Sequence, residues 1–123
     1  MLSHLSLGVR DLDRAGTFYD AMLAPLGAVQ VWRSPRGLGY GPPGGNDKLA
    51  LFLRDEERLA AGAGFHLAFA APSRQAVHDA FEAAMAHGGS SDGDPGPRPH
   101  YGDTYYAAFF FDPDGHRLEV VHQ

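Results

Sequence analysis

An internal repeat constrains this chain more than any other feature of its sequence. A shift of 62 residues, from residue 4 to residue 66, aligns the segment His4-Leu5-Ser6-Leu7 with His66-Leu67-Ala68-Phe69. The same shift, without a gap, aligns pairs at helix-cap, helix-face and helix-end positions: Asp11 with Ser73, Tyr19 with Phe81, Leu23 with Met85, and Gly27 with Gly89. Agreement over a strand, a cap, an apolar face and a terminator predicts two copies of one module.

Each copy begins with an alternating strand, continues with an amphipathic helix and ends with three short strands. The predicted first-copy strands are residues 5–9, 29–33, 38–41 and 48–53, with a helix for which Asp11 or Asp13 is the candidate cap and which stops at Pro25 and Gly27. The predicted second-copy strands are residues 65–70, a weak strand within 88–94, 105–111 and 117–122, with a helix capped by Ser73 and ending around 87–89. Residues 88–103 are rich in Gly, Pro, Ser and Asp, and are expected to form a long surface loop.

The repeated order predicts an α+β fold. We expect two βαβββ modules, residues 1–56 and 63–123, within a single domain. Together they would form an eight-stranded curved sheet, a half-barrel cup, with the helices on the outside. A chain of 123 residues is long enough to bury a core of its own.

Composition excludes several classes of function. The chain has no cysteine, so any metal must be held by imidazole and carboxylate groups. Ten basic residues are scattered and the net charge is −5, which argues against nucleic-acid binding. The sequence has no apolar run long enough for a membrane span and no signal-peptide pattern at Met1, so a cytoplasmic protein without a membrane partner is expected.

Three metal-ligand candidates lie on the sheet face that the helices do not cover. Strand alternation points Leu5 and Leu118 toward the helices and turns His4, His66 and Glu119 to the opposite face. Each could be an isolated polar residue on a half-exposed strand. A glutamate in the middle of an apolar strand rarely lies buried without a partner, however, and the two histidines are related by the repeat. Together they predict a divalent-metal site with open positions, suited to Fe²⁺, Mn²⁺, Zn²⁺ or Ni²⁺.

The sequence resembles the vicinal oxygen chelate superfamily, which comprises glyoxalases, bleomycin resistance proteins and extradiol dioxygenases. The resembling segments are residues 4–15 followed by Phe18-Tyr19, then Gly64 to Phe69, then Phe111-Asp-Pro-Asp-Gly-His-Arg-Leu-Glu119. The resemblance implies paired βαβββ modules, a metal held by His4, His66 and Glu119, and substrates that chelate it through adjacent oxygen atoms. One departure concerns the fourth ligand of glyoxalase I, which falls here on Ala50 or Phe52, so a two-His, one-carboxylate site is expected.

Further candidates lie in the loop and strand before the final turn. His100 is a candidate acid or base because imidazole is the side chain that ordinarily exchanges a proton near neutral pH, and Arg98 can pair with a carboxylate or phosphate. Tyr101 is a substrate-binding candidate. Tyr105 and Tyr106 alternate faces, so only one of them can enter the cup.

Aromatic residues of the first copy complete the candidate site. Trp32, Tyr40 and Phe52 are candidates for an apolar wall beside a small organic ligand, with core packing as the alternative for each.

These residues predict a divalent-metal-dependent enzyme that chelates vicinal oxygens of a small substrate, with dioxygenase-like chemistry slightly favoured. The alternatives are a glyoxalase-type lyase or isomerase, a thiol transferase, and a metal-free drug-binding protein of the bleomycin resistance type. A homodimer is expected, because pairing protects sheet edges and can complete the cup.

Overall fold

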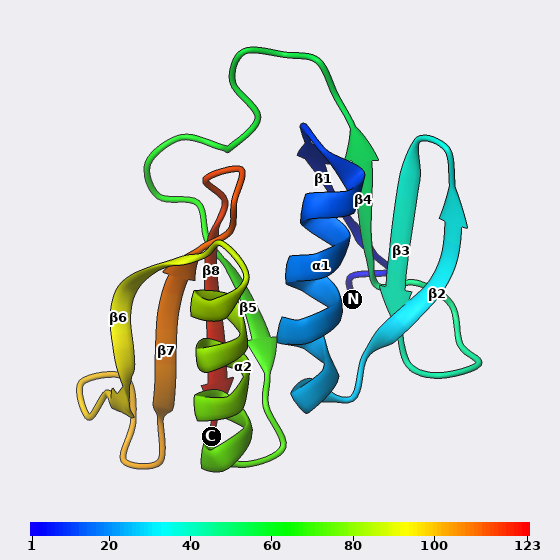
Figure 1. The fold of residues 1–123 in the computed structure, drawn as a ribbon. Helices are drawn as coiled ribbons and strands as arrows, with labels where there is room; N and C mark the ends of the chain where they lie inside the picture. The colour runs from blue at the N-terminus through cyan, green and yellow to red at the C-terminus, as the bar shows by residue number, and fades with distance from the viewer.

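A computed structural model describes residues 1–123, and it contains two helix-and-sheet units in succession (Figure 1). The elements of the first unit are β1 (Leu5–Val9), α1 (Leu12–Leu23), the 3₁₀ turn η1 (Ala24–Leu26), β2 (Val29–Ser34), β3 (Gly37–Gly41) and β4 (Leu49–Leu53). Those of the second are β5 (Leu67–Ala70), α2 (Arg74–Ala86), β6 (Ser90–Pro97), β7 (Tyr106–Phe111) and β8 (Arg117–His122).

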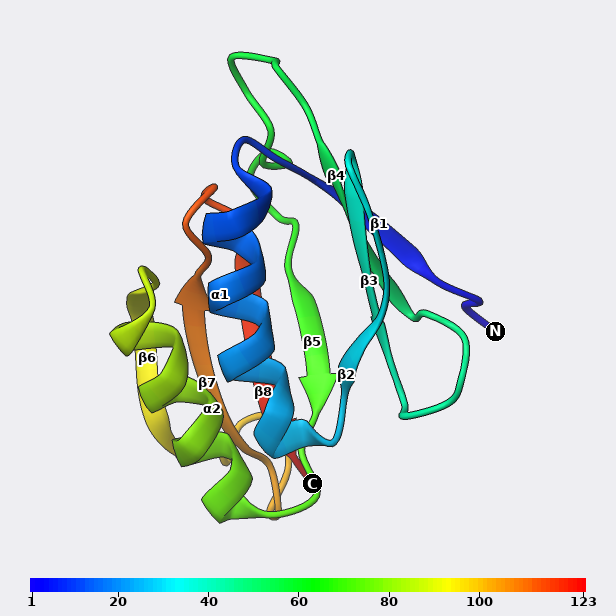
Figure 2. The ribbon, with the colours of Figure 1, turned by 45° about the vertical axis from the view of Figure 1, so that its right-hand side comes forward.

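The strands form two separate four-stranded sheets with the same connectivity. Their orders are β1-β4-β3-β2 and β5-β8-β7-β6. In each sheet the first and last strands of the module pair in parallel and the remaining pairs are antiparallel. The sheets lie side by side, with one helix against each (Figures 1 and 2). Each sheet therefore keeps one face that no helix of this chain covers.

One apolar core joins the two modules on the helix side. It includes Leu7 and Leu51 from the first sheet, Phe18 from α1, and Phe110 and Val120 from the second sheet. The helices α1 and α2 also pack against each other. Burial of these side chains on the helix face leaves the alternate positions of every strand on the opposite face.

Side-chain caps start both helices where the sequence predicts. The Asp11 carboxylate accepts a hydrogen bond from the Arg14 backbone amide at 3.0 Å, and the Ser73 hydroxyl accepts one from the Ala76 amide at 3.0 Å. Each bond satisfies an amide that the first helical turn leaves free. At the other end of the first helix, Gly27 adopts a left-handed conformation with φ of 85°, which a glycine accepts at no steric cost.

The turn before β8 fastens the second module to the first. The buried Asp112 carboxylate accepts the Tyr19 hydroxyl at 2.6 Å. Asp114 accepts the Arg14 guanidinium at 3.0 Å, and His116 Nε2 lies 2.8 Å from the Gly8 carbonyl oxygen. These bonds fix the two sheets relative to each other at one end.

The α+β fold with two βαβββ modules is confirmed, with two differences from expectation. The eight strands form two four-stranded sheets instead of one continuous sheet. Residues 90–97, expected mostly as loop, form the edge strand β6, whose pairing with β7 is broken by two register shifts. An edge strand with bulges tolerates the Pro and Gly residues that suggested a loop. No helix is long and apolar enough to cross a bilayer.

Candidate functional site

Glu119 and His66 meet on the uncovered face of the second sheet. Glu119 lies on β8, where the strand register places it between Ala68 of β5 and Phe109 of β7. His66 immediately precedes β5, and its Nε2 lies 3.1 Å from Glu119 Oε2. The Glu119 side chain is only 2% exposed, whereas that of His66 is 41% exposed. The pair thus joins a buried carboxylate to an imidazole that solvent can reach.

Tyr105 holds the second oxygen of the same carboxylate. Its hydroxyl donates to Glu119 Oε1 at 2.5 Å. Burial, then the hydrogen bond to Glu119 and the negative charge of Glu119, together raise the pKa of Tyr105 to about 12. The phenol therefore stays protonated near neutral pH and acts as a donor. A buried carboxylate needs such donors, because leaving it unpaired away from water costs several kcal/mol.

A hollow of about 170 Å³ opens beside this carboxylate. It is lined by six side chains: His66, Tyr101, Tyr105, Phe109, Arg117 and Glu119. The Phe109 ring forms the floor between two groups, with the His66 ring centre 6.2 Å away and the Arg117 guanidinium carbon 5.0 Å away. The hollow thus combines an aromatic floor with an imidazole, a carboxylate and a guanidinium.

His4 lies elsewhere in the same chain. It is exposed, hydrogen-bonds to the Ser3 hydroxyl at 3.0 Å, and lines a second hollow with Lys48, Leu49 and Phe69 among others. No group of three or more His, Asp or Glu side chains within one chain is close enough to hold a metal ion. One chain therefore brings together two of the three predicted ligands, His66 and Glu119.

The pair itself has the geometry of two ligands to one cation. Two donor atoms about 2.1 Å from a shared ion, at angles of about 90 to 110°, lie about 3.0 to 3.4 Å apart. The 3.1 Å between Nε2 and Oε2 falls within that range. One imidazole and one carboxylate are also a donor set suited to Fe²⁺, Mn²⁺, Zn²⁺ and Ni²⁺. The residues present fit a divalent cation, although a third ligand must come from outside this group.

The module repeat explains why only one such pair exists. Glu119 is opposite Ala68 in the second sheet, and the equivalent position opposite Ser6 in the first sheet is Ala50. Ala50 carries no ligand atom, so His4 has no carboxylate partner on its own sheet. Ala50, and not Phe52, therefore occupies the place where a fourth ligand was considered.

Comparison with known proteins identifies the family. The model for the Glyoxalase/Bleomycin resistance protein/Dioxygenase superfamily matches residues 1–120. The chain belongs to this superfamily. A comparison with curated proteins gives no match.

Solved structures of the superfamily share the fold over the whole chain. A glyoxalase/bleomycin resistance protein from Albidiferax ferrireducens T118 is 31% identical, with a TM-score of 0.83 over 98% of this chain and 97% of that one. A putative glyoxalase from Bacillus halodurans is 26% identical, with a TM-score of 0.76 over 100% of this chain and 96% of that one. The fosfomycin resistance protein FosX from Listeria monocytogenes is 22% identical, with a TM-score of 0.71 over 100% of this chain and 93% of that one. At that identity the similarity shows the fold alone.

Among the loop candidates, the two adjacent tyrosines separate as strand alternation predicts. Tyr105 enters the hollow, whereas the Tyr106 hydroxyl lies 2.6 Å from His78 Nε2 on the helix side. Tyr101 also lines the hollow, and its ring centre is 5.3 Å from that of Tyr105. His100 stacks on the outer side of Tyr101, 4.2 Å between centres, without lining the hollow. Tyr106 is therefore not a site residue of this hollow.

Arg98 is mostly occupied by its own loop. Its terminal nitrogens donate to the carbonyl oxygens of Asp94 and Gly96, both at 2.9 Å. Its guanidinium carbon lies 5.7 Å from the centre of the Phe109 ring, at the edge of the hollow. The side chain thus shapes the loop before Tyr105, whose backbone also pairs with that of Arg98.

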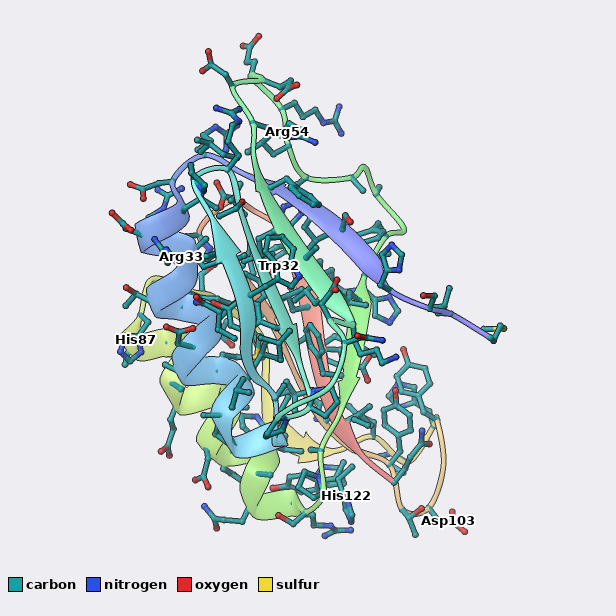
Figure 3. The ribbon with its side chains drawn as sticks, turned by 90° about the vertical axis from the view of Figure 1, so that its right-hand side faces the viewer. Trp32, Arg33, Arg54, His87, Asp103 and His122 are labelled. Carbon is teal, nitrogen blue, oxygen red and sulfur yellow. The ribbon has the colours of Figure 1, made fainter.

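The aromatic candidates of the first module lie on a different sheet. Trp32 lies on the first sheet, where Figure 3 labels it. The Phe52 ring packs against it, 6.0 Å between ring centres, on the face away from α1. A Cβ at Gly39 would overlap the Trp32 indole, so the glycine makes room for that ring. Tyr40 is buried in the core with its hydroxyl 2.8 Å from Asp20. Of the two alternatives that the sequence left open for Tyr40, the structure shows core packing.

Sequence reasoning overlooked two residues of the hollow, Phe109 and Arg117. Both could have been found by period-two alternation: Arg117 is two positions before Glu119, and Phe109 is four positions after Tyr105, so each shares a face with a predicted site residue.

Proposed function

We propose that this chain is a divalent-metal-dependent enzyme whose cation is held by His66 and Glu119 of one copy and His4 of a second copy. The observation that carries the proposal is the 3.1 Å approach of His66 Nε2 to a nearly fully buried Glu119 carboxylate. Tyr105 occupies the other carboxylate oxygen, which leaves Oε2 and the imidazole facing the hollow. An outer hydrogen bond that orients a ligand in this way is typical of metal sites.

The third ligand is assigned to a second copy for two reasons. His4 is exposed and free of any carboxylate, so it is available to another chain. Each sheet also has an uncovered face, and stacking the first sheet of one copy on the second sheet of another would close both faces into a cup. A two-fold dimer would contain two such cups, each with a complete set of ligands.

A cation in this position supplies Lewis acidity toward adjacent oxygen atoms of a substrate. The residues of the chain supply binding and orientation. Phe109 offers an apolar floor, and Tyr101 a second ring above the hollow. Dioxygenase-like chemistry is slightly favoured over lyase, isomerase or thiol-transfer chemistry, because Ala50 provides no fourth ligand and leaves more open positions.

Mixing two variants that each lack one proposed ligand tests whether the cation site is shared between two copies. Neither His4→Ala nor His66→Ala should bind Zn²⁺ tightly alone. After subunit exchange of equal amounts, about a quarter of the sites should recover wild-type affinity, because about half of the dimers are mixed and each mixed dimer contains one intact site of two. No recovery, with both variants folded, would rule out a ligand from the second copy. Unchanged binding by His4→Ala would remove His4 from the ligand set.

Reaction type is tested by reconstitution. Protein loaded anaerobically with Fe²⁺, Mn²⁺, Ni²⁺ or Zn²⁺ is screened with catechols, thiol adducts of α-ketoaldehydes, and fosfomycin. Turnover of one class identifies the chemistry. Failure of the wild-type chain to take up more than about 0.1 equivalent of any cation would contradict the proposal. That result would favour the metal-free drug-binding alternative, for which the Trp32–Phe52 pair offers an aromatic surface.

A further inference from the structure

Arg117 is the one fully charged basic residue that lines the hollow beside Glu119. It begins β8 and lies two positions before Glu119 on the same face of the strand. Its Nε donates to Asp92 Oδ2 at 2.7 Å, and its guanidinium carbon lies 5.0 Å from the centre of the Phe109 ring. The ion pair and the ring hold the guanidinium in one place without using its outer end.

The outer end of Arg117 has no acceptor in the chain. The bond to Asp92 is the only hydrogen bond that the side chain makes, so both terminal amino groups keep their N–H donors. Arg98 lies over the same ring, but its terminal nitrogens already donate hydrogen bonds to loop carbonyl oxygens. A guanidinium that is anchored at Nε and free at its fork is ready to bind an oxyanion with little loss of side-chain freedom.

The carboxylate of the hollow does not occupy the outer end of Arg117. Both oxygens of Glu119 are already in contact with Tyr105 and His66, so neither is paired with the terminal amino groups of the guanidinium. A divalent cation at His66 and Glu119 would add positive charge to the hollow. We propose that Arg117 binds an oxyanion group of the substrate, a carboxylate or phosphoryl group, so that the substrate is a small organic anion. The inference deepens the proposed function, and it rests on that function in treating the bound anion as a substrate.

Binding of inorganic phosphate and of acetate, measured by calorimetry and by amide chemical shifts, tests this assignment with and without Zn²⁺. In Arg117→Gln the dissociation constant for phosphate should rise about tenfold or more, because a charge-assisted two-point contact is lost. Arg117→Lys should fall between, since it keeps the charge but not the fork. Asp92→Asn should bind phosphate more tightly than the wild type, because the amide keeps an oxygen that can accept from Arg117 Nε while the competing negative charge is removed. If the dissociation constant for acetate changes in these variants as that for phosphate does, the site also accepts a carboxylate. If only the dissociation constant for phosphate changes, the site is specific for a phosphoryl group.

The matched control is Arg74→Gln. Arg74 also lies over an aromatic ring of this sheet, 4.7 Å from the centre of Tyr106, but on the helix side and away from the hollow. Its removal should leave phosphate affinity unchanged. Equal phosphate affinity in wild type, Arg117→Gln and Arg117→Lys would overturn the inference.

Failure of this inference and failure of the proposed function give different results. If Zn²⁺ binds as expected and phosphate binding ignores Arg117, the anion site is wrong and the metal site stands. If phosphate depends on Arg117 but the chain takes up no cation, the anion site stands and the metal-dependent function is wrong. Zn²⁺ affinity of Arg117→Gln should stay within about threefold of wild type, because Arg117 contributes no ligand atom.

Discussion

The phenol of Tyr105 shows how one residue can prepare a buried carboxylate for a partner. Glu119 has two oxygens, and Tyr105 takes one at 2.5 Å while His66 lies against the other at 3.1 Å. The raised pKa of Tyr105, about 12, keeps the proton on the phenol throughout the physiological range. One side of the carboxylate is thereby fixed, and the other keeps a defined direction into the hollow.

Tyr105→Phe should weaken Zn²⁺ binding by about tenfold or more, since outer hydrogen bonds to metal ligands typically contribute that much. A chelator-competition titration measures it. Tyr101→Phe is the matched control, because that ring lines the same hollow but its hydroxyl makes no hydrogen bond to Glu119. Equal Zn²⁺ affinity in both variants would show that the Tyr105 bond is only structural.

Much at the residue scale could be predicted from strand alternation. It placed His66 and Glu119 on one face and separated Tyr105 from Tyr106, as the geometry confirms. The same rule places Arg117 on that face too, but a basic residue at the start of a strand looks like an ordinary surface charge, so it was not predicted as a site residue. The contact with Phe109 depends on pairing between β7 and β8, which one sequence does not specify.

The turn between β7 and β8 contains a buried carboxyl group, Asp112, whose pKa differs from its ordinary value. Burial raises the pKa of Asp112 above its ordinary value of 3.8, although the His116 charge and hydrogen bonds from Tyr19 and the turn backbone act in the opposite direction. Between 3.8 and the raised pKa, the folded chain binds more protons than the unfolded chain. Stability therefore falls as pH rises through that interval and is level above it.

Asp112→Asn should remove this component of the pH dependence. The amide can still accept from the turn backbone and can donate to the Tyr19 oxygen, so the contacts are kept while the charge is lost. Relative to wild type, the variant should gain stability as pH rises from about 4 through the raised pKa of Asp112. Urea unfolding at several pH values measures it, with exposed Asp103→Asn as control. Parallel pH curves for Asp112→Asn and wild type would contradict the linkage.

The strand β3 needs a glycine at position 39, because the Trp32 indole occupies the space that a Cβ would fill. Gly39→Ala would push the Trp32 indole off the sheet, at a cost of about 1 to 3 kcal/mol in the free energy of unfolding. The chain has one tryptophan, so its emission reports on that ring directly and should shift to the red. Gly62 lies in an open segment where only the end of the Arg58 side chain comes within 4 Å of an added Cβ. Gly62→Ala should therefore change neither the free energy of unfolding nor the tryptophan emission. An unshifted emission spectrum in Gly39→Ala would be evidence against close stacking.

Among the elements, those with clear periodicity or caps were predictable, whereas the edge strand β6 was predicted only in part, as a weak strand within residues 88–94. The Asp11 and Ser73 caps and the alternating strands have local signals, and the repeat supported each with a second copy. The strand β6 contains Gly93, Pro95 and Gly96 and is held by pairing with β7 across bulges. Its structure comes from a partner distant in sequence, so local composition suggests a loop.

At the scale of the whole molecule, the sequence predicted which face each ligand shares but not how the two sheets are placed. Alternation gives the face within one sheet, whereas the relative position of the sheets is set by α1 packing on α2 and by the turn at Asp112. With that placement, His4 and the His66–Glu119 pair do not form one cluster in a single chain. The missing contact is one that a second copy would make.

If the third ligand comes from a second copy, metal binding and dimer formation must strengthen each other. Adding Zn²⁺ should lower the dimer dissociation constant at least tenfold, because the ion binds the dimer better than the monomer. Sedimentation of dilute protein, with Zn²⁺ or with a chelator, measures the change. In His4→Ala the dissociation constant should no longer respond to Zn²⁺. A wild-type dimer indifferent to Zn²⁺ would be inconsistent with a shared ion.

Ala50 and Glu119 occupy equivalent places in the two modules, yet only one carries a ligand atom. The duplicated halves have therefore divided their tasks. Substitutions on the open face of the first sheet, around Trp32, can alter the shape of whatever fits against it while the carboxylate half is left intact. A chain built this way can acquire new ligand preferences by changing one half while the chemistry-bearing half stays as it is.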